Sequence, residues 1–121
     1  MALVDTYSIV AVDVAGGEMG VAVQSHYFSV GSVVPWAKAG VGVVATQSVV
    51  NVDFGPEGLR LLEKGMSPRE ALDTMLAGDS QAAYRQVALA APDGEVATHT
   101  GPGCIPDAGH ETGEGFSVQA N

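Results

Sequence analysis

One cysteine and two histidines near the C-terminal end of the sequence could do chemistry together. His99, Cys104 and His110 lie in and around a glycine-rich stretch. A Cys–His pair can act as a nucleophile and its base, and a His/Cys/His set can hold zinc with water in a fourth position. Both require the side chains to converge; otherwise Cys104 is a buried structural thiol and the histidines are structural. Cys104 and His110 are therefore one candidate catalytic pair. We expect neither a metal nor another cofactor.

Polar residues also follow two of the apolar runs in the sequence. Ser25 and His26 come directly after the second run, and Gln47 and Asn51 lie at the end of the third. Polar side chains at the ends of apolar strands often line a pocket, although strands also end in polar residues where there is none. We predict that these four residues bind substrate.

Three β-branched runs predict the strands that position these residues. They cover Tyr7–Val14, Met19–Gln24 and Val41–Val50, and a turn-forming cluster at Ala15–Glu18 makes the first two a hairpin. Because the runs are almost continuously apolar rather than alternating, we expect the strands to be covered on both faces.

Two start signals predict a helical hairpin on one face of the sheet. Gly55-Pro56 opens the first helix, and the capping box Ser67-Pro68-Arg69-Glu70 opens the second. Gly65 and Gly78 end them. This hairpin is too short to cover both faces of such a sheet.

The chain then returns to strands. Tyr84–Ala91 and Glu95–Thr100 flank the turn signal Pro92-Asp93-Gly94 and predict a second hairpin. A glycine-rich loop over Gly101–Gly115 leads to a last strand-like run, Phe116–Ala120. Since the sequence stops directly after this run, we expect that another chain covers the sheet or that the polypeptide is part of a longer one. The alternative is a two-layer α+β domain with one exposed face.

Composition excludes several classes of function. The chain has 121 residues, a single cysteine and a formal net charge of −9. Nucleic acid and anionic membranes would repel such a surface, and one cysteine excludes an internal disulfide. No apolar run approaches the length of a membrane span, and the first residues lack the basic start of a signal peptide. We predict a cytoplasmic location.

Five runs of residues extend along nearly the whole chain: TYSIVAV at 6–12, GVAVQSHYFSVG at 20–31, VVPWAKAGVGVVATQ at 33–47, GPEGLRLL at 55–62 and TGPGCIPDAGHETGEGFSVQAN at 100–121. They resemble a known family, the Ntn-hydrolase-like family called domain of unknown function 1028. The resemblance implies an α+β fold, a four-layer αββα sandwich, of which residues 1–121 are the N-terminal half. It further implies that members continue past the last of these runs.

The resemblance also implies a chemistry. Ntn hydrolases use an N-terminal Thr, Ser or Cys as nucleophile and its own α-amine as base. Position on the first strand makes Thr6 the nucleophile, and Lys38 resembles the lysine that polarises it in threonine-type members. The acid that such members carry on the second strand falls near Gln24 or Ser25. Because five residues precede Thr6, its amine is free only if they are removed; otherwise Thr6 is an ordinary strand residue.

Asn121 carries a separate hypothesis. An asparagine carboxamide can attack its own carbonyl carbon, which gives a succinimide and a new N-terminus on the following fragment. We therefore predict that Asn121 is a processing site in a longer precursor; a truncated polypeptide is the alternative.

These residues together predict a hydrolase of amide or peptide bonds in a small substrate, which includes the case of self-processing alone. Two alternatives stay open: a non-catalytic binding or assembly module with the same fold, and a thiol hydrolase built on Cys104 and His110. We expect an oligomer, in which the partner is a C-terminal fragment of the same precursor or another copy of the chain.

Overall fold

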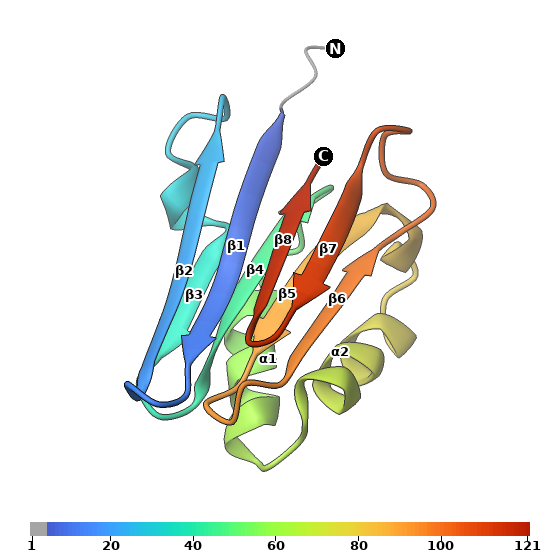
Figure 1. Ribbon diagram of the computed structural model, residues 1–121. Coiled ribbons are helices and arrows are strands. Elements are labelled where there is room, and N and C mark those ends of the chain that lie inside the picture. The colour runs from blue at the N-terminus through green and yellow to red at the C-terminus, as the bar shows by residue number, and fades with distance from the viewer. Residues whose placement is uncertain (1–4) are drawn as a thin grey trace.

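Two antiparallel four-stranded sheets stack face to face in the computed structural model, which describes residues 5–121 (Figure 1). The first sheet has the order β2-β1-β8-β7 and the second the order β3-β4-β5-β6. The strands are β1 (Thr6–Asp13), β2 (Glu18–Ser25), β3 (Pro35–Lys38), β4 (Gly42–Ser48), β5 (Arg85–Ala90), β6 (Val96–Thr100), β7 (Gly109–Gly113) and β8 (Phe116–Ala120). The other elements of residues 5–121 are the helices α1 (Phe54–Glu63) and α2 (Pro68–Ala77) and the short 3₁₀ turns Val30–Ser32 and Ala82–Tyr84.

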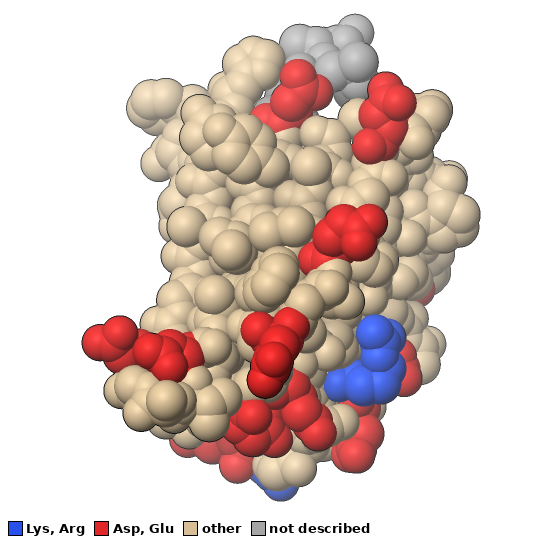
Figure 2. All heavy atoms as spheres, viewed as in Figure 1, with Lys and Arg blue, Asp and Glu red and all other residues tan. Residues whose placement is uncertain are grey.

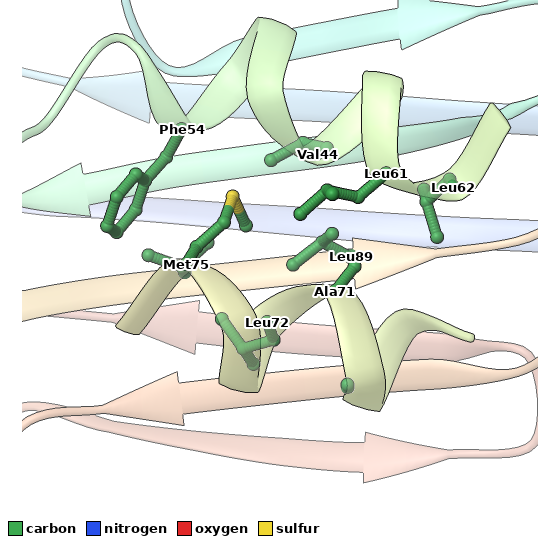
Figure 3. Packing of buried hydrophobic residues seen from close by; sticks show 10 residues of the cluster. Val44, Phe54, Leu61, Leu62, Ala71, Leu72, Met75 and Leu89 are labelled. Carbon is green, nitrogen blue, oxygen red and sulfur yellow. The ribbon is translucent and has the colours of Figure 1, made fainter. Parts of the chain in front are cut away.

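The two helices cover the outer face of the second sheet. The Ser67 hydroxyl accepts a hydrogen bond from the Glu70 N–H and caps α2, as the capping box predicts. One core cluster fills the space between the helices and the sheet (Figure 3). Its buried side chains include Val44 and Leu89 from the sheet and Leu61, Leu72 and Met75 from the helices. The predicted helical hairpin is therefore confirmed.

The strand predictions are confirmed for both hairpins, the third run and the last run, but the expected cover is only partly correct. Every residue of β5 is buried, as is every residue of β4 except Ser48. In contrast, β1 and β2 alternate, and the first sheet turns Tyr7 and Ile9 outward with 59% and 36% of their surface exposed. The prediction that these two strands are covered on both faces is wrong for the part of the chain that the structure describes.

The exposed outer face of the first sheet is apolar and hollowed. A groove of about 700 Å³ runs along it, lined by residues of all four strands, among them Tyr7, Ile9, Ala22 and Val118. Figure 2 views the molecule from this side and shows few charged side chains over the middle of the face, whereas acidic ones gather at the lower end. Across residues 5–121, no helix is long and apolar enough to cross a membrane.

Two strands were not predicted from the sequence. Pro35–Lys38 is short and begins with proline, which suits the edge position of β3. Gly109–Gly113 lies inside the stretch predicted as a loop, because two glycines and no apolar pattern mark it. Pairing with β8 makes β7 a strand, since Glu111 and Thr112 lie opposite Val118 and Ser117.

The contact between α1 and β3 leads to a stability prediction. A methyl group added at Gly55 would meet the Trp36 ring at distances too short for any real Cβ. We expect Gly55→Ala to lower the free energy of unfolding by about 1–3 kcal/mol, since a packed core tolerates added volume poorly. Gly31→Ala is the control, because that position is open and its φ is not positive. Urea unfolding of both variants measures the difference; equal stability would contradict the packing described here.

Candidate functional site

The space between the two sheets has an apolar part and a polar part. The apolar part is a second core cluster that includes Val10, Val43 and Ala88. The polar part consists of inward hydroxyls and carboxamides; it begins beside Val10 and Ala88, at Ser117 and Thr98, and extends to the end where β1 begins and β8 ends (Figure 1). We call this set the polar seam: Thr6, Ser8, Ser25, Gln47, Gln86, Thr98, Thr100, Ser117, Gln119 and Asn121.

Thr6 lies at the end of the polar seam where β1 begins. It is 7% exposed, and its hydroxyl shares a hydrogen bond of 2.8 Å with the Ser25 hydroxyl on the neighbouring strand. The Ser25 oxygen also accepts from the Tyr27 N–H at 3.0 Å, which fixes its position. On the other side, Thr6 and Asn121 exchange backbone hydrogen bonds of 3.3 and 2.9 Å. Because directly paired residues of antiparallel strands project to the same side, Ser25, Thr6 and Asn121 form one row facing the second sheet.

Gln86 joins this row to the second sheet. Its Nε2 lies within hydrogen-bond distance of the carbonyl oxygens of Gly109 and Ala120, at 3.0 and 2.9 Å, and of the Thr100 hydroxyl at 3.0 Å. Its Oε1 accepts from Gln47 Nε2 at 2.8 Å and from Asn121 Nδ2 at 3.1 Å. One fully buried carboxamide thus ties both sheets together.

Two further hydrogen bonds close the seam inside the first sheet. Gln119 Nε2 donates to the Ser8 hydroxyl and Gln119 Oε1 accepts from the Ser117 hydroxyl, each at 2.8 Å. Ser117 in turn shares a bond of 2.6 Å with Thr98 of the second sheet. Within the described residues, Gln47 Oε1 is the only buried side-chain oxygen or nitrogen without a partner. The seam is therefore almost fully satisfied by its own members, as buried polar groups require.

Lys38 does not join Thr6. Its ammonium forms an ion pair with Glu63 of α1 at 2.7 Å, on the helix-covered side of the second sheet. It also lies at the end of β3 next to the β3–β4 turn, the end of the sandwich opposite to the start of β1 (Figure 1). The structure consequently provides no route by which the Lys38 side chain polarises the Thr6 hydroxyl.

The four residues that we predicted to bind substrate lie in three different parts of the structure. Ser25 and Gln47 belong to the polar seam. His26 is exposed in the loop after β2. Asn51 lies beside the start of α1, where its carbonyl accepts from the Thr46 hydroxyl and its side chain from the Asp53 N–H.

Cys104 and His110 line a common hollow of about 330 Å³, but each has a different partner. The Cys104 sulfur accepts from the Ser48 hydroxyl at 3.3 Å and faces the Arg85 carbonyl at 3.5 Å. His110 Nδ1 shares a bond of 2.8 Å with the Thr100 hydroxyl. Among the bonds of residues 5–121, none joins the thiol to the imidazole.

His99 is separated from this hollow. Its Nε2 is bonded to the Ala82 carbonyl, and it lies opposite Val87, on the helix-covered face of the second sheet. His110 lies opposite Gln119, on the inner face of the first sheet. The three side chains that a His/Cys/His zinc site would need do not converge, and no group of three His, Cys, Asp or Glu suited to a metal occurs among residues 5–121.

The sequence analysis missed the centre of the seam, namely Gln86 and Gln119. A signal for them exists in the run Phe116–Ala120, where Ser117 and Gln119 alternate with apolar residues and so share one face of the strand. No such alternation marks Gln86, because both faces of β5 are buried.

A buried ion pair anchors the loop that follows β4 next to the seam. The Arg85 guanidinium donates to Asp79 at 2.7 and 3.1 Å and to the Val49 carbonyl at 2.8 Å. The hydrogen bonds from Arg85 hold the pKa of the Asp79 carboxyl below its ordinary value, against the opposing effect of burial. Neighbouring Ser48 adopts a left-handed conformation, with φ of 72°.

The fold and the seam define a class: a two-sheet α+β protein with helices on one outer face and a hydrogen-bonded polar part between its sheets. Residues 6–121 match the family of unknown function DUF1028, so the chain belongs to this family. The crystal structure of protein SPO2555 from Silicibacter pomeroyi, described as DUF1028, superposes with a TM-score of 0.92 at 30% sequence identity. The match covers 97% of this chain and 52% of that one, so the chain spans about half of its length. No curated protein matches the chain significantly.

The Asp79–Arg85 pair generates a pH prediction. Since the pKa of Asp79 is lower in the folded state, its ionised form stabilises the fold above about pH 4, its ordinary pKa, and this contribution is lost as the pH falls through the folded-state value. We expect Asp79→Asn to lower the Tm at neutral pH, and the gap from the unmodified protein to narrow on acidification. Asp73→Asn, which removes an exposed pair with Arg69, is the control. Thermal melts against pH measure both; a gap independent of pH would contradict this account.

Proposed function

We propose that the protein hydrolyses an amide bond of a small substrate with Thr6 as the nucleophile, and that it belongs among the Ntn-type αββα enzymes. The observation that carries the proposal is the position of Thr6. Its hydroxyl lies at the start of the first strand, between the two sheets, and is oriented by the Ser25 hydroxyl at 2.8 Å. The side chains that flank it, Ser25 and Asn121, are half-buried.

The α-amine of Thr6 would act as the base once residues 1–5 are removed. A threonine α-amine has a pKa of about 8 in the absence of perturbation, so it can accept a proton at neutral pH. The Thr6 nitrogen already lies 3.3 Å from the Asn121 carbonyl oxygen, an acceptor that would orient the free amine.

The reaction would proceed in two balanced steps. The Thr6 oxygen attacks the substrate carbonyl carbon while its proton passes to the amine. The C–N bond then breaks, the ammonium returns the proton to the leaving nitrogen, and an ester remains on Thr6. Water, deprotonated by the same amine, then attacks the ester carbonyl carbon; the C–O bond to Thr6 breaks, the ammonium returns the proton to the Thr6 oxygen, and the carboxylic acid leaves. Lys38 has no part in this scheme, because Glu63 holds its ammonium elsewhere.

A binding or assembly module is the second candidate. It is favoured by the covalent state of Thr6, whose nitrogen forms a peptide bond to Asp5 in this sequence. In that state Thr6 has no α-amine to act as a base.

The thiol hydrolase of Cys104 and His110 is the third candidate. Its only support is the hollow that the two side chains share, since Ser48 and Thr100 bind them instead. Processing at Asn121 and a cytoplasmic location stay predictions.

We further propose that the bare outer face of the first sheet is covered by the rest of a longer polypeptide. The related crystal structure contains nearly twice as much chain as this sequence matches. Strand β8 ends at the edge of the groove, and the face around it is apolar. A second copy of the chain is the alternative occupant.

The Thr6 hypothesis predicts the effect of removing the Thr6 hydroxyl. In full-length protein whose chain starts at Thr6, Thr6→Ala should abolish release of nitroaniline from a panel of aminoacyl 4-nitroanilides. Thr74→Ala is the matched control: it removes the same hydroxyl from the exposed side of α2, where it is bonded to the Glu70 carbonyl, and activity should not change. Undiminished hydrolysis by Thr6→Ala would exclude Thr6 as the nucleophile. Loss of activity on alkylation of Cys104, with Thr6→Ala still active, would support the thiol hydrolase.

If the rest of a longer polypeptide covers the groove, a charged substitution in the groove should destabilise the full-length protein more than the chain that ends at Asn121. Val118 is 38% exposed and lies in the groove. We expect Val118→Asp to destabilise the full-length protein by about 2 kcal/mol or more, because an unpaired carboxylate would be buried. In the chain that ends at Asn121 the same change should cost much less. Chemical unfolding of the two lengths gives the comparison. An equally small loss of unfolding free energy in both lengths would contradict the hypothesis that further chain covers the groove. A loss in the short chain that depends on protein concentration would indicate that a second copy of the chain covers it.

A further inference from the structure

We propose that Asn121 is a catalytic residue, whose side-chain N–H donates to the substrate carbonyl oxygen as Thr6 attacks. This inference rests on the proposed function and assigns to Asn121 a role in addition to any processing. It follows from two observations on the polar seam: the forced orientation of the Asn121 carboxamide, and its position directly beside Thr6.

The orientation of the carboxamide follows from the hydrogen-bond chain behind it. The carbonyl oxygens of Gly109 and Ala120 can only accept, so the nitrogen of the Gln86 side chain must face them. The oxygen of Gln86 therefore faces Asn121, and Asn121 must present its nitrogen, at 3.1 Å. Asn121 Nδ2 carries two hydrogens, and this bond uses one. Within residues 5–121, no protein acceptor takes the second.

The position of Asn121 follows from the strand pairing. Thr6 and Asn121 exchange both backbone hydrogen bonds, so they are direct partners across β1 and the end of β8. Side chains of such partners leave the sheet on the same side with their Cβ atoms about 5.5 Å apart. A carbonyl group attacked by the Thr6 hydroxyl would therefore lie within reach of the free N–H of Asn121.

A donor at this place has a defined chemical effect. As the Thr6 oxygen bonds to the carbonyl carbon, the carbonyl π electrons move onto the substrate oxygen, which becomes an oxyanion until the C–N bond breaks. A fixed N–H stabilises this charge more than it stabilises the neutral carbonyl, so it accelerates the reaction rather than tightening binding. Ser25, on the opposite side of Thr6, already holds the hydroxyl and leaves the Asn121 side for the carbonyl.

An aliphatic β-lactone tests the proposal without knowledge of the substrate. The Thr6 hydroxyl opens the ring by the same attack: an ester bond forms at Thr6, the ring C–O bond breaks, and the ring oxygen takes the proton. Full-length protein whose chain starts at Thr6 should gain the mass of one lactone on the peptide that begins with Thr6. Asn121→Ala should acylate roughly 10²–10³-fold more slowly, the loss typical of one oxyanion donor, with an unchanged half-saturating lactone concentration. Asn121→Ala leaves Gln86 Oε1 bonded to Gln47, so the seam keeps its other bonds.

Gln81→Ala, which removes a carboxamide bonded to Arg85 outside the seam, is the matched control and should acylate at the normal rate. Equal rates for Asn121→Ala and the unmodified protein would overturn the Asn121 role while leaving Thr6 as the nucleophile. Absence of any adduct on Thr6 in the unmodified protein would overturn the proposed function itself. If Asn121→Ala does not fold, Asn121→Ser is measured instead, and loss of the fold in both variants would overturn the proposal in favour of a structural role.

Discussion

The hydrogen bonds of the Gln86 carboxamide are the constraint on which the arrangement around Thr6 depends. Both polar atoms of this carboxamide are buried, and each accepts or donates bonds that reach the opposite sheet. A buried carboxamide without partners would cost several kcal/mol, so the sheets must keep the spacing and register that satisfy it. That register brings β8 beside the start of β1 and places Asn121 next to Thr6. The candidate site is thus a consequence of how the seam is satisfied.

The apolar and polar parts of the space between the sheets have different physical roles. The apolar part, around Val10 and Val43, supplies stability without directional bonds, since apolar burial has no orientational requirement. The polar part supplies little net stability per bond, because each bond replaces one to water, but it fixes the orientation of every group in it. Such fixed dipoles are what a reaction that develops charge requires. The helices stabilise the second sheet from outside and take no part in the seam.

Sequence patterns predicted most of the elements and few of the contacts. Capping signals and β-branched runs gave both helices and six of the eight strands, because these signals are local. The strands Pro35–Lys38 and Gly109–Gly113 depend on pairing with distant partners, which no local pattern encodes. Thr6 and Lys38 illustrate the same limit for the site: their spacing resembles that of a threonine-type hydrolase, yet the fold places them at opposite ends of the sandwich. Gln86 escaped prediction because a buried polar residue among apolar ones has no periodic signature.

The central claim, a nucleophilic Thr6 with a free α-amine, is tested most directly by the N-terminus of the protein isolated from the cells that make it. Peptide mass analysis after labelling of free amines identifies the first residue. The account predicts a labelled peptide that begins with Thr6 and a loss of residues 1–5. A protein whose labelled N-terminus is Met1 or Ala2 throughout would leave Thr6 without its base and would contradict the account.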